Sequence, residues 1–342
     1  MSGPEDEAPV GDKEGPVDEF DWIDRHLRPL AGDAPEALAL ADDAAVIPAR
    51  PGFDLVVSKD AIVEGVHFLA SDPLDLVARK LLRVNLSDLA AKGAEPYGYF
   101  LAVAWPPGFG WSARRAFVEG LGQDQRRFGL KLFGGDTVST PGPLTASVTI
   151  MGWVPAGAMV RRAGARVGDV VLVTGAIGDG GLGLRAARGE GLGLPMDDQA
   201  RLKARYQTPE PRLDLGEALR RWAHAAADVS DGMIADAGRI ASASAVRVTL
   251  DIDRMPISAA AGAWLAMQPD RDAARLALAA AGDDYEILCT APPPAVAPLK
   301  AAAEALGFAM TEIGIVSAGE GVEVTSQGRV VAVNRSGWRH GQ

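Results

Sequence analysis

The stretch Leu74–Lys92, LDLVARKLLRVNLSDLAAK, has the pattern of a helix in a region that is otherwise strand-like. Its large apolar side chains repeat at helical spacing and cover one face; they include Leu82, Leu86 and Leu89. Asp88 lies inside the stretch, with Asn85 three residues before it and Lys92 four residues after it, so these polar side chains share another face. The pattern predicts a helix that packs on one side and presents a carboxylate to solvent or to a ligand on another.

The segments around this helix predict a first α+β domain over residues 18–153. We expect strands at 44–47, 55–58, 99–105, 130–133 and 145–153, and helices at 19–30, 74–92 and 113–128. Residues 1–17 are rich in acids, Pro and Gly and hold hardly any large apolar side chain, so we expect a disordered acidic tail there.

Residues 154–342 predict a second domain of α/β type. The expected strands are 169–174, 247–252 and 285–290, with short strands near Gly314, Val322 and Val330, and the expected helices are about 213–224, 233–243 and 295–306. No internal repeat is evident. The chain therefore has two ordinary domains, which suits its length of 342 residues.

The negative charge balance of the chain limits the kinds of partner that it can bind. With 34 Lys and Arg against 45 Asp and Glu, the formal net charge is −11, which repels nucleic acid and anionic membranes. The sequence lacks the roughly 20 apolar residues of a membrane span, and its N-terminus is acidic where a signal peptide is basic, so we expect a cytoplasmic protein. The single cysteine, Cys289, lies in an apolar run, which predicts a buried and inert thiol.

Carboxylates recur where an apolar run meets a turn with Gly or Ser. They are Asp42, Asp43, Asp60, Asp136, Asp228, Asp231, Asp283 and Asp284. Each one alone has an ordinary explanation as a turn former or helix cap. The same arrangement in both halves of the chain favours a shared site. Because like charges repel, such a site needs cations, and oxygen ligands without a Cys or His cluster select Mg²⁺ or Mn²⁺.

The common nucleotide-binding motifs are absent from the sequence. It has no G-x-x-x-x-G-K-[ST] and no kinase-type H-R-D or D-F-G set. Residues 178–183, GDGGLG, match the G-x-G-x-x-G fingerprint, but a polar stretch follows where a second strand with an acid is required. A nicotinamide or flavin enzyme is therefore a minor alternative.

Seven ordered motifs carry a resemblance to a known family. They are ADDAAV at 41–46, SKDAIVEGVHF at 58–68, NLSDLAAKGAEP at 85–96, GGDT at 134–137, VRRAGARVGD at 160–169, DVSDG at 228–232 and GDDYEI at 282–287. From about Phe20 to Trp338 the chain resembles the thiamine-monophosphate kinases of the aminoimidazole-ribonucleotide-synthetase-like superfamily. The resemblance implies a mixed-sheet N-terminal domain that pairs with its copy in a homodimer, and an α/β C-terminal domain that completes the active site. It also implies the substrates, ATP and thiamine monophosphate.

The same resemblance assigns roles to individual residues. The residues implied to hold several Mg²⁺ ions are Asp43, Ser58, Lys59, Asp60, Asp88, Asp136, Asp228 and Asp231. Those implied to contact ATP are Gly135, Asp136, Arg162 and Ser230, and those implied to hold thiamine monophosphate are His67, Asp283 and Trp338. Two positions depart from the family pattern. Lys59 stands where relatives often have a hydroxyl, so a backbone carbonyl would have to serve, and Asp283 stands where Glu is common.

The chemistry implied by the resemblance agrees with the residue types. A phosphomonoester is mostly dianionic at pH 7, so adding a phosphoryl group to it needs no general base. Bringing two polyanions together needs metal ions and positive donors, which a site rich in Asp with one or two Arg supplies. His67 and Trp338 have structural alternatives, as a packed strand-end histidine and as a cap on the core.

Two other functions compete with this one. Another ATP-dependent synthetase of the superfamily would share the motifs, although selenophosphate synthetase typically has a reactive Cys or selenocysteine near its N-terminus, and this chain has none there. A catalytically silent nucleotide-binding protein would have lost metal ligands, and the ligand set here is complete.

Overall fold

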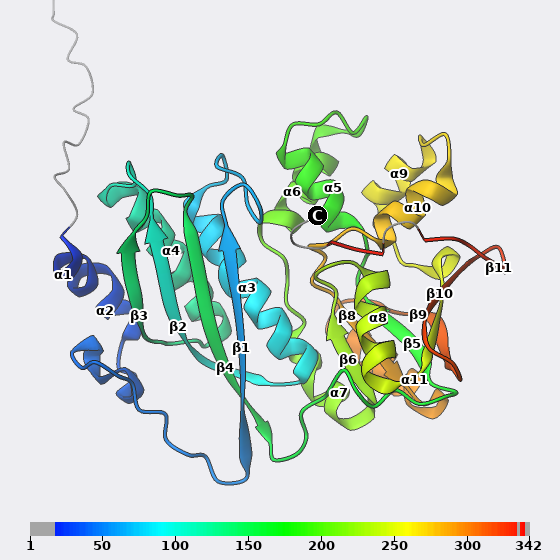
Figure 1. Cartoon of the computed structure of the whole chain (residues 1–342), viewed down its shortest axis with the longest axis horizontal. Coiled ribbons are helices and arrows are strands. Elements are labelled where there is room, and N and C mark those ends of the chain that lie inside the picture. Colours follow the sequence, from blue (N-terminus) through cyan, green and yellow to red (C-terminus); the bar gives the residue numbers. More distant parts are fainter. Residues whose placement is uncertain (1–17, 334–335, 339–342) are drawn as a thin grey trace, which may run out of the picture.

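The computed structural model of the protein describes residues 18–333 and 336–338. It contains two β-sheets with flanking helices, which lie side by side in Figure 1. The first sheet has the strand order β1-β4-β2-β3. Its strands are β1 (Phe53–Val63), β2 (Glu95–Trp105), β3 (Leu132–Ser139) and β4 (Thr145–Pro155). Only β2 and β3 run parallel, so the sheet is mixed, as expected.

Helices α3 (Leu74–Lys92) and α4 (Trp111–Phe128) pack on one face of this sheet (Figure 1). The bounds of α3 match the prediction, because its leucines repeat at helical spacing and are buried against inward-facing residues such as Leu101 and Val148. The helix ends at Gly93, which adopts a left-handed conformation (φ 67°) and donates its N–H to the carbonyls of the last turn. A side chain there would also collide with Gly216 of the second domain.

The N-terminal segment confirms one prediction and corrects another. Helical turns run through α1 (Glu19–Trp22), a π-turn (Ile23–Leu27) and α2 (Arg28–Ala31), followed by a 3-10 segment (Pro35–Leu40). The strand expected at 44–47 is wrong, because this part of the described chain lies outside both sheets. Ala45 and Ile47 instead pack against Phe133 and Met151, so their apolar character reflects packing on the first sheet and not pairing within it.

The second sheet has the order β11-β10-β7-β9-β5-β8-β6 and is antiparallel except between β7 and β10. Its strands are β5 (Val170–Thr174), β6 (Ala225–Asp228), β7 (Arg247–Asp251), β8 (Ile287–Ala291), β9 (Met310–Ser317), β10 (Gly321–Ser326) and β11 (Arg329–Val330). The prediction missed β6, because a short run of alanines before an aspartate has no strand signature.

Helices of the second domain pack around this sheet (Figure 1). They are α5 (Asp179–Ala187), α6 (Met196–Gln207), α7 (Gly216–Trp222), α8 (Met233–Ser244), α9 (Ala259–Ala266), α10 (Arg271–Ala279) and α11 (Pro293–Ala305), with 3-10 turns at Leu213–Leu215 and Ile252–Arg254. We did not predict α5, α6, α9 or α10. Helix α5 is rich in glycine and α6 is mostly polar, so neither shows a clear apolar period.

Two expectations from composition can be compared with this fold. Cys289 lies in β8 and is buried, and burial raises the pKa of its thiol to about 12, which makes it unreactive. Within the described residues, none of the helices combines the length and apolar character needed to cross a bilayer.

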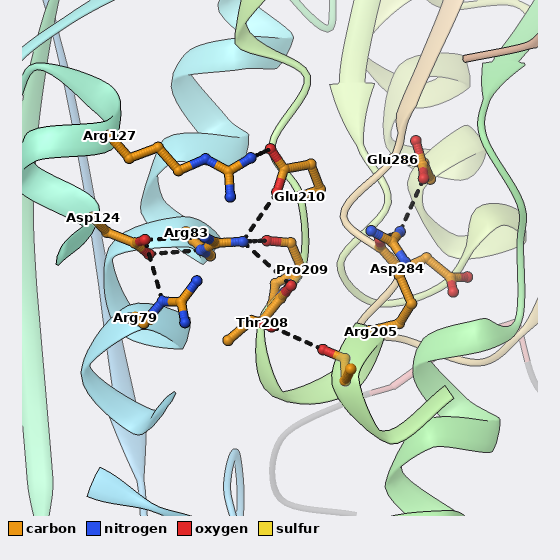
Figure 2. Close-up of polar contacts among 11 residues, drawn as sticks. Arg79, Arg83, Asp124, Arg127, Arg205, Thr208, Pro209, Glu210, Asp284 and Glu286 are labelled. Atoms are coloured by element: carbon orange, nitrogen blue, oxygen red, sulfur yellow. Dashed lines mark hydrogen bonds and ion pairs between the residues drawn. The ribbon is translucent and has the colours of Figure 1, made fainter. Parts of the chain in front are cut away.

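A buried arginine on α3 joins the two domains (Figure 2). The guanidinium of Arg83 donates to both carboxylate oxygens of Asp124 on α4, at 2.6 and 3.0 Å. Its remaining nitrogen donates to the second domain, at 3.1 Å to the carbonyl of Pro209 and 3.0 Å to Glu210. Since both Arg83 and Asp124 are almost fully buried, this network fixes the position of the linking segment after α6.

We predict that Arg83→Met lowers the free energy of unfolding by about 3 to 5 kcal/mol, because it leaves the buried carboxylate of Asp124 without its bidentate partner. Urea denaturation measures the change. The matched control is Arg127→Gln, which breaks the half-exposed pair with Glu210 and should cost at most about 1 kcal/mol. Equal losses in the two variants would contradict this account of the domain junction.

Candidate functional site

The site begins where β1 lies against α3. The hydroxyl of Ser58 donates to Asp88 at 2.5 Å, and the backbone N–H of Asp60 donates to the Asn85 side chain at 3.0 Å. Asn85 and Asp88 are one turn apart on α3, so the predicted polar face of this helix meets the strand directly. Asp60 lies inside β1, and the expectation that it follows a strand at a turn is therefore wrong.

The second domain adds two carboxylates to the same place. Asp228, buried at the end of β6, accepts a hydrogen bond of 2.9 Å from Ser87 of α3. Burial, followed by the charges of Asp88 and Asp231, raises the pKa of Asp60 to about 6, and burial with the charge of Asp88 raises the pKa of Asp228. We call this set of groups from both domains the junction cluster: Ser58, Asp60, Asp88, Asp228 and Asp231.

The donor set of the junction cluster fits Mg²⁺ in an open arrangement. Over residues 18–333 and 336–338, no three Asp, Glu, His or Cys side chains converge closely enough to enclose an ion by themselves. Mg²⁺ is commonly held by one or two carboxylates and completes its octahedron with waters and substrate phosphates. All donors here are oxygens, and burial together with the charges of neighbouring carboxylates raises the pKa values of Asp60 and Asp228.

Two cations lie near the junction cluster. The Lys92 ammonium donates to the carbonyl of Ala226 at 2.9 Å. Burial and then the charge of Arg162 lower the pKa of Lys92, while Asp228 and Asp88 act in the opposite direction. The charge of Arg162, a predicted ATP contact, thus acts on Lys92, and Lys92 is a further positive group that the site prediction did not include.

The loop with Ser230 and Asp231 is held by α8 and by the end of the chain. The backbone N–H groups of both residues donate to the buried carboxylate of Asp236, at 3.1 Å each. Arg239 pairs with Asp231 and Asp236 together. The backbone N–H of Trp338 donates to the carbonyl of Asp231 at 2.8 Å, so this predicted substrate contact, whose ring is partly exposed, lies beside the same loop.

Asp43 and Asp136 lie on the opposite face of the first sheet. The backbone of Asp136 pairs with Ala102 on an exposed row, and β3 is the edge strand farthest from β1, roughly 14 Å away. Asp136 lies within β3 and does not follow it at a turn, contrary to expectation. Asp43 is exposed in the 41–47 segment that packs on this same face. A single chain does not bring either residue to the junction cluster, and their metal roles stay predictions.

Lys59 and Gly135, two further predicted site residues, lie in strands of the first sheet. The side chain of Lys59 alternates with those of Ser58 and Asp60, so it points away from α3 and only its backbone is near the junction cluster. Gly135 pairs with Leu101, and an added Cβ would lie 1.8 Å from the Leu101 carbonyl, so only glycine fits.

His67 and Asp283, two predicted substrate contacts, lie close to one another through shared partners. His67 is in the turn after β1, and its Nδ1 accepts the Val63 N–H at 3.0 Å, so the neutral ring has its proton on Nε2. Lys80 donates to the His67 carbonyl at 2.9 Å and contacts Asp283 at 3.4 Å. The N–H of Asp283 donates to the Ser230 carbonyl at 2.9 Å, which joins the segment with Asp283 to the loop with Ser230 and Asp231.

The glycine-rich loop at 178–183 binds an anion from its own chain. The N–H groups of Gly178 and Gly180 donate to the two oxygens of the buried Asp284, at 2.8 and 2.9 Å. Arg205 of α6 donates to the Asp284 carbonyl and to Glu286 (Figure 2). The glycine-rich loop therefore anchors the segment that carries Asp283. The backbone amides of Gly178 and Gly180 are directed at Asp284 and not at a dinucleotide.

Comparison with known proteins agrees with the two-domain fold. Two protein-family models match the chain. The model for the N-terminal domain of AIR synthase related proteins matches residues 41–154, and the model for their C-terminal domain matches residues 166–327. The chain is therefore a two-domain member of the AIR synthase related class.

The individual relatives are more specific. The thiamine-monophosphate kinase of Caulobacter vibrioides is 53% identical over 326 residues, which cover 95% of this chain and 92% of the relative. The crystal structure of thiamine-monophosphate kinase from Stenotrophomonas maltophilia K279a is 39% identical with a TM-score of 0.79, covering 92% of this chain and 98% of that one. The structure of AaThiL complexed with AMPPCP and TMP is 29% identical with a TM-score of 0.74, covering 94% and 96%. The chain belongs to the thiamine-monophosphate kinase family.

We predict that Gly180→Ala destabilises the protein by about 1 to 3 kcal/mol, because its Cβ would lie 2.4 Å from the backbone of Asp283 and force the two loops apart. Thermal unfolding measures the loss. Gly191→Ala is the matched control, since a Cβ at Gly191 meets nothing within 4 Å, and this variant should be neutral or slightly stabilised. A neutral Gly180→Ala would show that the loop does not clamp the Asp283 segment.

Proposed function

We propose that the chain transfers the terminal phosphoryl group of ATP to the phosphate of thiamine monophosphate, giving ADP and thiamine diphosphate. The observation that carries this function is the junction cluster, in which carboxylates of both domains lie beside the segment with Asp283, whose backbone N–H donates to the carbonyl of Ser230. The close relatives are thiamine-monophosphate kinases, and AaThiL was solved with an ATP analogue and TMP.

The residues of the chain account for the requirements of this reaction. The acceptor phosphate is already mostly dianionic, so no side chain has to remove a proton from it. Ser58 and Ser87 fix the orientation of Asp88 and Asp228, which pre-forms the metal-binding face before any ligand arrives. When bound by these carboxylates, Mg²⁺ would neutralise the phosphate oxygens of both substrates and orient them for in-line transfer.

The other proposed contacts surround this face. Arg162 and Ser230 would bind ATP from the second domain, and Gly135 from the first. Thiamine monophosphate would be held by His67, Asp283 and Trp338. The flat Trp338 ring would stack on the cationic thiazolium, and the Asp283 carboxylate would attract the positive charge of that ring. These roles come from the resemblance, and the shared loop contacts of Asp283 and Trp338 support them.

We also propose that the chain works as a homodimer in the cytoplasm, where its co-substrate ATP is abundant. The face of the first sheet opposite α3 leaves large apolar side chains open, with Val57 54% and Val138 49% exposed. Asp43 and Asp136 lie on this same side, so a second copy packed there would cover both residues. The molar mass in solution should be twice that of the 35.6 kDa chain, and a monomeric active enzyme would contradict the proposal.

Asp88→Asn should lower kcat at least about 100-fold without unfolding the protein, because Asp88 lies at the centre of the junction cluster. The assay follows ADP and thiamine diphosphate, expected in equal amounts, from ATP, Mg²⁺ and thiamine monophosphate. Asp75→Asn is the matched control, a carboxylate of the same helix about 20 Å away, and should keep its turnover.

Two results would contradict the assignment. Near-normal turnover in folded Asp88→Asn would remove Asp88 from the site. Efficient phosphorylation of free thiamine would mean that the acceptor phosphate is not what the site orients.

A further inference from the structure

Lys80 is a buried cation that the proposed phosphoryl transfer does not use. It lies on α3, toward the opposite end from Asp88, and its side chain is only 3% exposed. The ammonium donates to the carbonyl of His67 at 2.9 Å and contacts the carboxylate of Asp283 at 3.4 Å. It also lies 3.6 Å from the ring centroid of Tyr206. One ammonium thus joins the turn after β1, the loop before β8 and helix α6.

An ammonium in this position is costly unless its partners compensate. Burial lowers the pKa of Lys80, and the charge of Asp283 is the largest opposing influence. An apolar side chain would fill the same space without that cost. What only a cation with several donors can do here is hold a carbonyl and a carboxylate from separate segments at a fixed distance.

Each carboxylate oxygen of Asp283 has a polar partner, yet the side chain remains partly exposed. Lys80 contacts one oxygen, and the hydroxyl of Tyr285 donates to the other at 3.1 Å. The backbone of Asp283 is left-handed (φ 67°), and the Ser230 carbonyl accepts its N–H. The side chain of Asp283 is still 27% exposed, whereas that of Lys80 is not accessible. A ligand can therefore reach Asp283, and Lys80 acts from behind it.

We propose that Lys80 is a positioning residue for thiamine monophosphate, which sets the separation between His67 and Asp283 without touching the substrate. This inference rests on the proposed function and assigns a specificity role to a residue outside the family motifs quoted above. His67 is held by the same arrangement, because Tyr206 donates its hydroxyl to the same carbonyl at 3.2 Å. Lys80 and Tyr206 together form a support under the turn that contains His67.

The test separates the binding of the two substrates. Lys80→Met keeps the length and apolar stem of the side chain and removes its charge and donors. We expect the KM for thiamine monophosphate to rise at least tenfold, while the KM for ATP and the kcat stay within about threefold. Lys80→Arg, which restores a cation with donors, should recover part of the loss. Arg79→Met is the matched control, since it removes a neighbouring cation whose partner Asp124 keeps Arg83.

A double-mutant cycle with Asp283→Asn tests whether Lys80 acts through Asp283. The effect of Asp283→Asn on the KM for thiamine monophosphate should be at least halved in the Lys80→Met background. Additive effects would overturn the proposal, and so would a KM for ATP that rises as much as that for thiamine monophosphate. If Lys80→Met does not fold, Lys80→Gln, which removes the charge but keeps a polar side chain, is measured in the same cycle, and an unchanged KM with full additivity again overturns the proposal.

Assays of the wild-type protein distinguish a failure of the proposed function from a failure of the role of Lys80. Absence of thiamine diphosphate with wild-type protein would reject the proposed function. Wild-type turnover together with a normal KM in folded Lys80→Met would reject only the role of Lys80.

Discussion

The architecture depends on a single helix, α3, that is buried between two domains and yet carries polar side chains on several of its faces. Each of these side chains meets a different element: Arg83 reaches α4 and the segment after α6, Ser87 reaches β6, and Asp88 reaches β1. Because buried polar groups must find partners, these contacts determine how the domains sit on the helix. The same contacts assemble the site. The geometry of the active site therefore depends on the relative position of the two domains.

This arrangement leaves the site well ordered but electrostatically incomplete. Serine hydroxyls orient the carboxylates of Asp88 and Asp228, whereas burial and mutual repulsion raise the pKa values of Asp60 and Asp228. The Mg²⁺ that we propose for this site would relieve these unfavourable charge interactions. An acidic protein with a net charge of −11 can in this way bind two polyanionic substrates.

The sequence predicted those parts of the molecule that have a local pattern. Helix α3 was placed to the residue because its leucines repeat at helical spacing, and most of the carboxylates that gather at the junction were found from their recurring context. The strand at 44–47 was wrong because packing on a sheet and pairing within it produce the same apolar run. Lys80 and the capture of Asp284 by the glycine-rich loop depend on contacts across more than 100 residues, which leave no short-range signal.

We propose that the carboxylates at the domain junction bind nucleotide only through Mg²⁺. A ligand that binds the folded state alone raises the melting temperature by mass action. The most direct measurement compares the melting temperature in Mg²⁺, in the nonhydrolysable analogue AMPPCP with a chelator, and in both ligands together. The account predicts a shift with Mg²⁺ and AMPPCP that clearly exceeds the sum of the separate shifts. An equal shift for AMPPCP in the chelator would contradict it and would return these carboxylates to a purely structural role.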